Sequence, residues 1–201
     1  MKRLFIALLF CSAGFVSGQG KAIPVRISVG NEATAIPYTR FLSLPLHPSF
    51  QAGTEFQYKQ SSHHYLYQTA NLGYIFHNYL YQGAYISSEI GYDYKFGFGL
   101  NAKALFGLGY LHTFTTQQEY RFENGEFVKG ADRGNARFMP SLSIGAGYRF
   151  DKNDDNPVEI FLLYQSWIEY PYSPGFIPVM THICLQAGIK FFILTNRPDE
   201  K

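Results

Sequence analysis

Hydrophobic and polar residues alternate with a period of two over most of the chain. Between Leu80 and Phe96 the even positions are mainly apolar, whereas the odd positions include Glu89, Asp93 and Lys95. Side chains of a β-strand point alternately to opposite faces, so this segment predicts a strand with one apolar and one polar face. The same pattern recurs along the chain and predicts strands at 50–59, 66–76, 80–96, 98–110, 138–150, 158–169 and 181–191.

A further strand is expected at 23–30, where Ile23, Ile27 and Val29 share one face with Val25. This segment is short and contains Pro24, which removes a backbone donor. Single-chain bacterial membrane barrels have an even number of strands, which favours counting it as the eighth. The fold class predicted is all-β, an antiparallel barrel of eight strands.

The N-terminus has the features of a secretion signal. Lys2 and Arg3 precede an apolar stretch, and small residues lead to a predicted cleavage before Gln19. We therefore expect a signal peptide at 1–18 and a single domain at 19–201, with a short polar tail at 194–201. Removing residues 1–18 removes two basic residues and no acidic residue, so the net charge falls from +2 to about 0. This balance gives no reason to expect nucleic acid as a partner.

The direction of the two faces decides between a water-soluble and a membrane barrel. A soluble β-sandwich or lipocalin-like barrel would place many lysines and glutamates on its outer face. Here the polar faces are dominated by Gly, Ser and Gln, which suit a crowded lumen, while the apolar faces are rich in aromatic residues. After the signal, no apolar run is long enough for a transmembrane helix. The pattern therefore predicts a barrel with lipid outside and polar groups inside.

The connections between the strands give an orientation. The longest, at 115–137, is rich in charge and glycine. Long loops of such barrels are extracellular, which also places 31–46 and 171–177 outside and both termini in the periplasm. Within 115–137, two short segments around Glu123 to Gly125 are expected to pair as a hairpin.

The chain resembles the small eight-stranded outer-membrane β-barrel proteins of Gram-negative bacteria, the OmpA/OmpX-like group, and its start is reminiscent of the Bacteroidota versions. The resemblance covers residues 23–193 and rests on architecture. It implies location in the cell outer membrane, with outer-membrane lipid and lipopolysaccharide as surroundings. It does not indicate a particular function.

Acidic and basic residues nearly balance on the predicted lumen face. An eight-stranded barrel has an interior that side chains can fill, so we expect a paired polar core and no open channel. The predicted lumen network consists of Arg26, Glu55, Glu89, Asp93, Lys95, Lys103, Arg149, Glu159, Glu169 and Lys190, with Lys59 on the same face. A narrow conducting channel is the alternative for this set of residues.

A lipid-modifying enzyme of the outer leaflet, of the lipid A deacylase or acyltransferase type, is a second alternative. His47 and Ser49 have the His-x-Ser spacing of the deacylases, with Glu55 downstream. Both residues share parity with the lumen face, whereas such enzymes act on lipid outside the wall. His112 faces lipid but lacks a serine two residues later. We therefore predict no catalytic residues.

Metal and cofactor binding are likewise not expected. His182 and Cys184 share one lumen face, but the sequence shows no third ligand beside them. His63 and His64 are placed in a solvated periplasmic turn. Cys184 is the single cysteine after the signal, so no disulfide within the chain is expected.

Small residues on the predicted lipid face could allow close approach of another protein. Ala84, Ser88, Ala102 and Ala104 are assigned to such a docking patch. The function expected from the sequence is thus non-catalytic: a structural or accessory barrel, alone or as a subunit of a larger outer-membrane complex, that presents loops 31–46 and 115–137.

Overall fold

The structure is a computed structural model of the 201-residue chain. It describes residues 22–77, 80–117, 120–123, 125–130, 133–150, 157–173 and 175–194. The predicted signal peptide and residues 195–201 of the predicted tail lie outside the described residues. Within the described part, no helix is long and apolar enough to cross a membrane.

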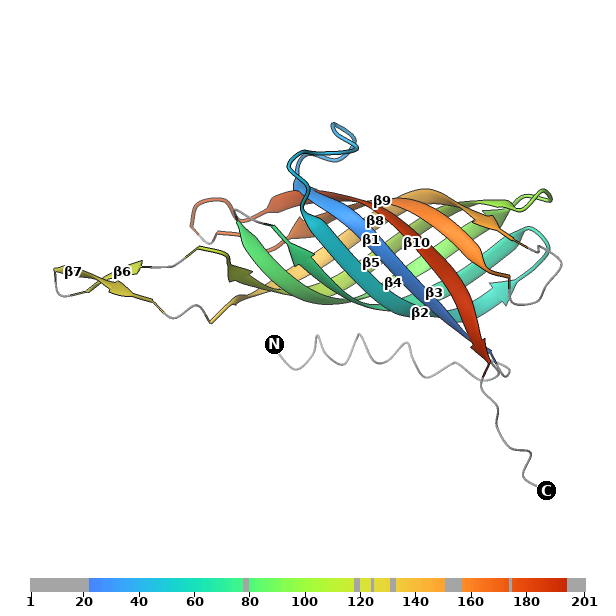
Figure 1. The fold of residues 1–201 in the computed structure, drawn as a ribbon, viewed down its shortest axis with the longest axis horizontal. Coiled ribbons are helices and arrows are strands. Elements are labelled where there is room, and N and C mark those ends of the chain that lie inside the picture. The colour runs from blue at the N-terminus through green and yellow to red at the C-terminus, as the bar shows by residue number, and fades with distance from the viewer. Residues whose placement is uncertain are drawn as a thin grey trace, which may run out of the picture.

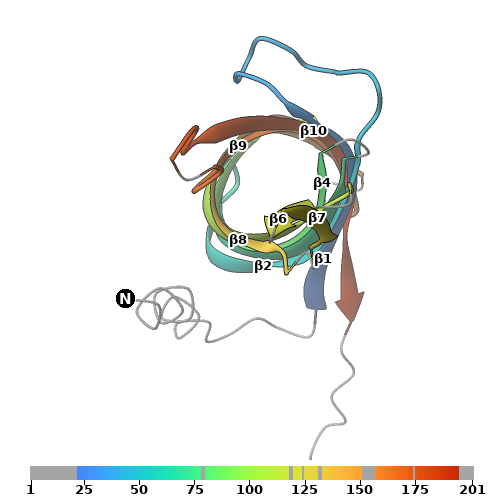
Figure 2. The same ribbon diagram turned by 90° about the vertical axis from the view of Figure 1, so that its left-hand side faces the viewer.

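Eight antiparallel strands form a closed barrel (Figures 1 and 2). Around the barrel the order is β1-β10-β9-β8-β5-β4-β3-β2, and β1 pairs with both β2 and β10. The strands are β1 (Ala22–Thr34), β2 (Pro48–Gln60), β3 (His64–Phe76), β4 (Tyr81–Lys95), β5 (Leu100–Thr115), β8 (Asn135–Arg149), β9 (Glu159–Glu169) and β10 (Met180–Leu194). The predicted fold class is confirmed, including the eighth strand, which extends beyond the predicted 23–30.

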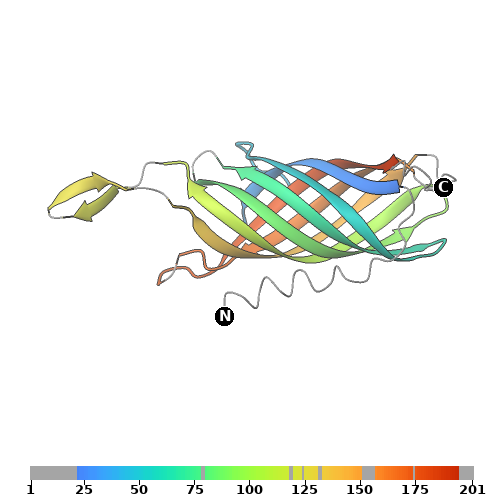
Figure 3. The ribbon, with the colours of Figure 1, turned by 90° about the horizontal axis from the view of Figure 1, so that it is seen from below.

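A separate hairpin lies between β5 and β8. It consists of β6 (Tyr120–Glu123) and β7 (Glu126–Lys129), which pair only with each other in the described structure. Figures 1 and 3 show this hairpin, in yellow, projecting beyond one end of the barrel. The hairpin predicted inside segment 115–137 is therefore present.

The two ends of the barrel differ in their connections. Ala22 pairs with Leu194, so the described ends of the chain lie together, and we call this the terminal end. The short connections 61–63 and 96–99 lie at the same end. The opposite end, called the loop end, carries the hairpin and the connections after β1, β3 and β9.

Side chains alternate between the lumen and the outer wall along each strand. In β4, Glu89 and Asp93 are buried inside, whereas Ile86 and Ile90 are about half exposed outside. The exposed apolar side chains include members of all eight barrel strands. A wall that is apolar outside and polar inside is the arrangement of a transmembrane β-barrel.

A β-bulge in β2 makes one predicted assignment wrong. Gln57 lies opposite Tyr67 on β3, but the next pair along is Lys59 with Leu66. The extra residue reverses the alternation, so Lys59 is exposed and does not belong to the lumen network. The placement of His64 in a turn is also wrong, because His64 begins β3 and its ring contacts the hydroxyl of Tyr92 at 2.6 Å.

The connection between β1 and β2 folds back over the outside of the barrel. Figure 2 shows this segment, in blue, outside the ring of strands near β10. Tyr164 stacks on Tyr38, and its hydroxyl donates to the carbonyl of Arg40 (3.0 Å) and accepts from the amide of Tyr38 (2.9 Å). Tyr164, Ala33 and Ile183 are consequently buried although they lie on the outer wall.

Candidate functional site

A layer of paired charges fills the lumen near the terminal end. The ammonium of Lys103 contacts Asp93 at 2.5 Å and Glu159 at 2.6 Å. Lys190 contacts Glu55 at 3.1 Å and Glu159 at 3.8 Å. All five residues are buried. Each carboxylate therefore has a cation close to it, which offsets the cost of removing these charges from water.

Other side chains complete the same layer. Arg26 lies 3.6 Å from Glu55 and stacks over the ring of Phe161 at 4.8 Å. The hydroxyl of Tyr65 donates to Glu55 (3.1 Å), and that of Tyr67 donates to Asp93 (2.9 Å). The carboxylates of this layer thus accept hydrogen bonds from neutral donors in addition to their ion pairs.

Several of these contacts bridge strands that are not neighbours. Lys103 lies on β5 and Glu159 on β9, with β8 between them. Lys190 on β10 reaches Glu55 on β2 across β1. The layer therefore extends across the lumen as well as along its wall.

Glu89 occupies the middle of the lumen and is held by neutral donors. Its carboxylate accepts hydrogen bonds from Ser141 (3.0 Å), Gln165 (3.2 Å) and Asn71 (3.2 Å). Gln165 is on β9 and Glu89 on β4, so this bond also crosses the lumen. In the described structure Glu89 has no ion-pair partner within 4.0 Å, which distinguishes it from the carboxylates of the terminal end.

The remaining residues of the predicted network lie apart from that layer. Lys95 is buried at its edge, with its ammonium 4.6 Å from the ring centre of Tyr65. Arg149 is half-buried near the connection after β4, where it donates to the carbonyl of Phe96 at 3.5 Å. Glu169 lies at the loop end. The structure therefore places most of the predicted network at the terminal end, Glu89 in the middle and Glu169 alone at the loop end.

The loop end contains a chain of buried ion pairs. His182 lies between two carboxylates, with Nδ1 at 2.7 Å from Glu32 and Nε2 at 3.3 Å from Glu169. Arg137 contacts the other oxygen of Glu169 at 2.9 Å. The indole of Trp167 stacks on the His182 ring, with centroids 3.9 Å apart. These contacts fix the orientation of the His182 ring and the position of one carboxylate oxygen of Glu32.

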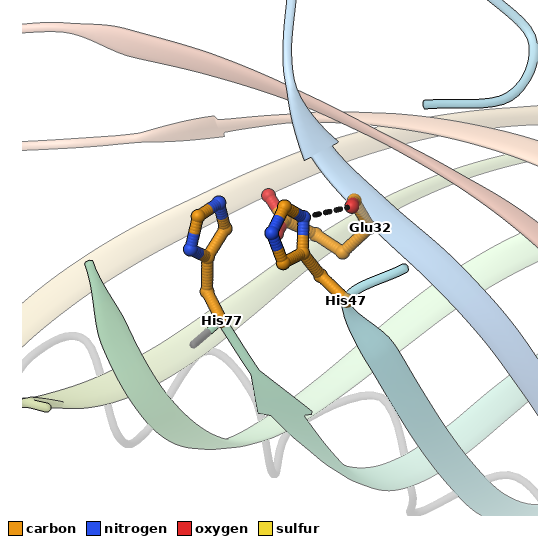
Figure 4. Close-up of side chains that lie close together, drawn as sticks. All are labelled: Glu32, His47 and His77. Carbon is orange, nitrogen blue, oxygen red and sulfur yellow. Dashed lines mark hydrogen bonds between the residues drawn. The ribbon is translucent and has the colours of Figure 1, made fainter. Parts of the chain in front are cut away.

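Three residues beside this chain form a group with the ligand types of a metal site: Glu32, His47 and His77 (Figure 4). Each offers one ligand atom, and these atoms lie within 4.8 Å of one another. The two imidazoles stack with their centroids 3.5 Å apart, and all three side chains are buried. His77 lies just beyond the end of β3, and burial lowers its pKa, which favours the neutral ring that can bind a metal.

The residues considered for lipid chemistry do not form a catalytic group. His47 and Ser49 are both buried in the lumen, and Ser49 Oγ lies 3.1 Å from Cys184 Sγ. Glu55 belongs to the charged layer of the terminal end, six residues further along β2, a separation of about 20 Å along a strand. His182 and Cys184 are both buried, but the group with metal-ligand geometry contains neither.

The four residues assigned to a docking patch do not gather in one place. Ser88 pairs with Leu108, and Ala84 pairs with His112, toward the loop end. Ala102 and Ala104 pair with Tyr94 and Tyr92, toward the terminal end. The four small residues are therefore spread along two neighbouring strands, with Ala84 and Ser88 on β4 and Ala102 and Ala104 on β5. The docking patch stays a prediction.

Comparison with known proteins finds likeness in structure only. No family model matches the chain, and no curated protein sequence matches it. Neisserial surface protein A (NspA) has 11% identity, a TM-score of 0.54 and coverage of 87% of this chain and 99% of its own. Ail, the attachment invasion locus protein of Yersinia pestis, has 9% identity, a TM-score of 0.48 and coverage of 87% and 100%. The outer membrane enzyme PagL has 11% identity, a TM-score of 0.47 and coverage of 82% and 97%.

Of these three, NspA alone exceeds a TM-score of 0.5, and at 11% identity the likeness concerns the fold. The closed order of eight antiparallel strands, the apolar outer wall and the polar lumen agree with that likeness. The chain therefore has the fold of the eight-stranded outer-membrane β-barrels.

Proposed function

We propose that this protein is a closed, non-catalytic β-barrel of the outer membrane with a structural or accessory role. The observation that carries the proposal is the packing of the lumen. At the terminal end Lys103 contacts Glu159 and Lys190 contacts Glu55, in each case between strands that are not neighbours. Glu89 and Gln165 meet across the middle of the lumen. A passage for ions would require these paired and hydrogen-bonded groups to separate, which is costly in a buried site.

Two features support location in the outer membrane: the secretion signal and the apolar outer surface of the barrel. The N-terminal segment has the pattern of a cleaved secretion signal, and the strands that follow present an apolar surface suited to hydrocarbon. The same reasoning makes outer-membrane lipid and lipopolysaccharide the direct surroundings of the wall. We place the loop end at the cell surface and both termini in the periplasm, because the longest connection lies at the loop end.

The loops at that end are the parts available to other outer-membrane proteins. Segment 35–46 exposes large apolar side chains beside the wall, among them Phe41, Leu44 and Leu46. The hairpin of β6 and β7 exposes Phe122 and Phe127, whose rings pack on each other with centroids 5.2 Å apart. Exposed apolar groups of this size favour contact with lipid or with a partner over free solution.

Two measurements test the proposal against its alternatives. In planar bilayers the purified barrel is expected to add no channel conductance. In a deletion strain, mass spectrometry is expected to find unchanged lipid A, while resistance to detergent decreases. Stepwise conductance would support a channel, and a change in lipid A acylation that the restored gene reverses would support an enzyme. Either result would overturn the proposed role.

A further inference from the structure

The group formed by Glu32, His47 and His77 is not used by the proposed structural role. It lies inside the barrel at the loop end, and its members come from three different strands or their ends. Glu32 is on β1, His47 immediately precedes β2, and His77 immediately follows β3 (Figure 4). Three potential ligands from separate elements therefore converge on one point.

Two polar atoms of this group are buried without a hydrogen-bond partner: Oε2 of Glu32 and Nε2 of His47. Neither atom takes part in an ion pair of the described structure. Glu32 has no exposed surface and His47 is 5% exposed, so bulk solvent does not reach these atoms. A buried polar atom without a partner lowers stability, and this cost is removed when a ligand binds it.

The neighbouring contacts also orient both free atoms for a cation. Nδ1 of His47 lies 3.1 Å from the backbone carbonyl of Glu32, and because a carbonyl only accepts, Nδ1 carries the proton. In the neutral ring Nε2 then holds a free lone pair. Nδ1 of His182 contacts Oε1 of Glu32 at 2.7 Å, which leaves Oε2 as the free oxygen. Such second partners fix the orientation of metal ligands in many proteins.

The backbone positions of the group are fixed as well. The amide of Glu32 donates to the carbonyl of His47 at 2.8 Å, and the amide of His47 donates to the side chain of Asn31 at 2.7 Å. The amide of His77 donates to the carbonyl of Tyr81 at 2.8 Å. The backbones that carry the ligands would therefore need little rearrangement, whereas the stacked rings of His47 and His77, whose planes are 17° apart, would have to tilt for both lone pairs to meet one ion.

We propose that Glu32, His47 and His77 bind one divalent transition metal ion, of which Zn²⁺ is the best fit, at the loop end of the lumen. Two imidazoles and one carboxylate suit zinc and similar ions, whereas Mg²⁺ and Ca²⁺ prefer oxygen ligands. Three protein ligands leave a fourth position of a tetrahedral site for water or another small ligand.

Binding at this point would also stabilise the base of the outer loop. Glu32 and His47 stand on either side of segment 35–46, and Asn31 bonds to the carbonyl of Ser43 within it at 2.8 Å. A metal ion shared by Glu32, His47 and His77 would connect β1, the start of β2 and the end of β3. The loop that lies along the outer wall would then be anchored from inside the lumen.

The test uses the full-length mature barrel without an affinity tag, refolded in detergent and titrated with ZnCl₂ by calorimetry. We expect one Zn²⁺ per barrel, and binding at least about tenfold weaker in each of H47A, H77A and E32Q, since loss of a supporting contact alone reaches that size. Heat-modifiable gel migration verifies that each variant is folded. CoCl₂ should give visible absorption bands with the wild type that H77A lacks.

The matched control is H63A/H64A, which removes two histidines at the terminal end and should bind Zn²⁺ as the wild type does. MgCl₂ and CaCl₂ should give no comparable heat. The proposal is overturned if the folded wild type binds no Zn²⁺. It is equally overturned if H63A/H64A abolishes binding, or if folded H47A and H77A bind Zn²⁺ as tightly as the wild type.

Discussion

The two ends of the lumen differ in the contacts that their buried charged side chains make. At the terminal end Lys103 and Lys190 each contact two carboxylates, and the oxygens of Glu159 both lie within 4.0 Å of a lysine. At the loop end the ion pairs involve His182 and Arg137, and the adjacent Glu32 and His47 each retain a buried atom without a partner.

The difference separates a structural role from a binding role. At the terminal end the buried atoms without a hydrogen-bond partner belong to Arg26, to Asn101 and to carboxylates that already contact a cation, so they do not make up a group of metal ligands. Histidine and carboxylate atoms that are buried, oriented and without a partner cost stability unless something binds them. The terminal end is therefore interpreted as the part that closes the barrel, and the loop end as the part that binds.

The largest effect is expected from K103M at the terminal end. This change leaves Asp93 and Glu159 without the cation that they share, and removing one partner of a buried pair costs about 3–5 kcal/mol. Unfolding by guanidinium, followed by gel migration, measures the loss. K129M in the exposed hairpin is the control, expected to change stability by less than about 0.5 kcal/mol. Equal effects of the two variants would contradict a paired layer.

The loop end should respond to metal, and the terminal end should not. Zn²⁺ at 100 times its Kd is expected to raise the free energy of unfolding by about 2.7 kcal/mol in the wild type and in H63A/H64A, but not in H77A. Removing the ion with a chelator should reverse the gain. A gain of the same size in H77A would show that Zn²⁺ acts elsewhere.

Acidification should weaken the binding of Zn²⁺, because protons compete for both imidazoles. Between pH 7.5 and pH 5.5 the affinity is expected to fall, since only a neutral imidazole can bind the metal ion. Calorimetry at the two pH values measures this change. An affinity that does not depend on pH would exclude histidine ligands.

The close packing of the lumen can be tested without changing a charge. A Cβ added to Gly145 would lie 2.1 Å from the backbone oxygen of Leu162, whereas one added to Gly97 meets no atom within 4 Å. We expect G145A to destabilise the barrel by about 1–3 kcal/mol and G97A to be close to neutral. The same unfolding assay applies, and a neutral G145A would indicate a looser lumen.

The smallest effect concerns the outer loop. Y164F removes the hydroxyl that bonds to Tyr38 and Arg40, a loss of about 1–2 kcal/mol that is confined to the loop. Trypsin should then cleave after Arg40 about 5- to 30-fold faster, while the barrel itself remains folded. Y148F on the exposed wall is the control. Unchanged cleavage in Y164F would indicate that other contacts hold the loop.

Alternation along the sequence was enough to predict the barrel, because the direction of a strand side chain depends only on parity. It failed where an extra residue reverses parity, as at Lys59 after the bulge. Glu32 and His77 were missed because the predicted strands end at 30 and 76. Continuing the alternation would have placed both in the lumen, since Glu32 shares the parity of Ser28 and His77 that of Ile75.

Other features could not be predicted from parity at all. Alternation assigns Tyr164 to the outer wall, but it carries no information about a loop that covers the wall. Likewise it places His47 in the lumen without indicating which residues of other strands lie beside it. That depends on the register between strands and on the fold of the connections, which the structure supplies.

The most direct test of the difference between the two ends is a crystal structure of the tag-free barrel grown with ZnCl₂, with anomalous diffraction data collected at the zinc edge. The account predicts a zinc peak in the lumen, about 2.0–2.1 Å from one nitrogen of His47 and one of His77 and close to Glu32. No peak at this position, or a peak confined to His63 and His64 at the terminal end, would contradict it.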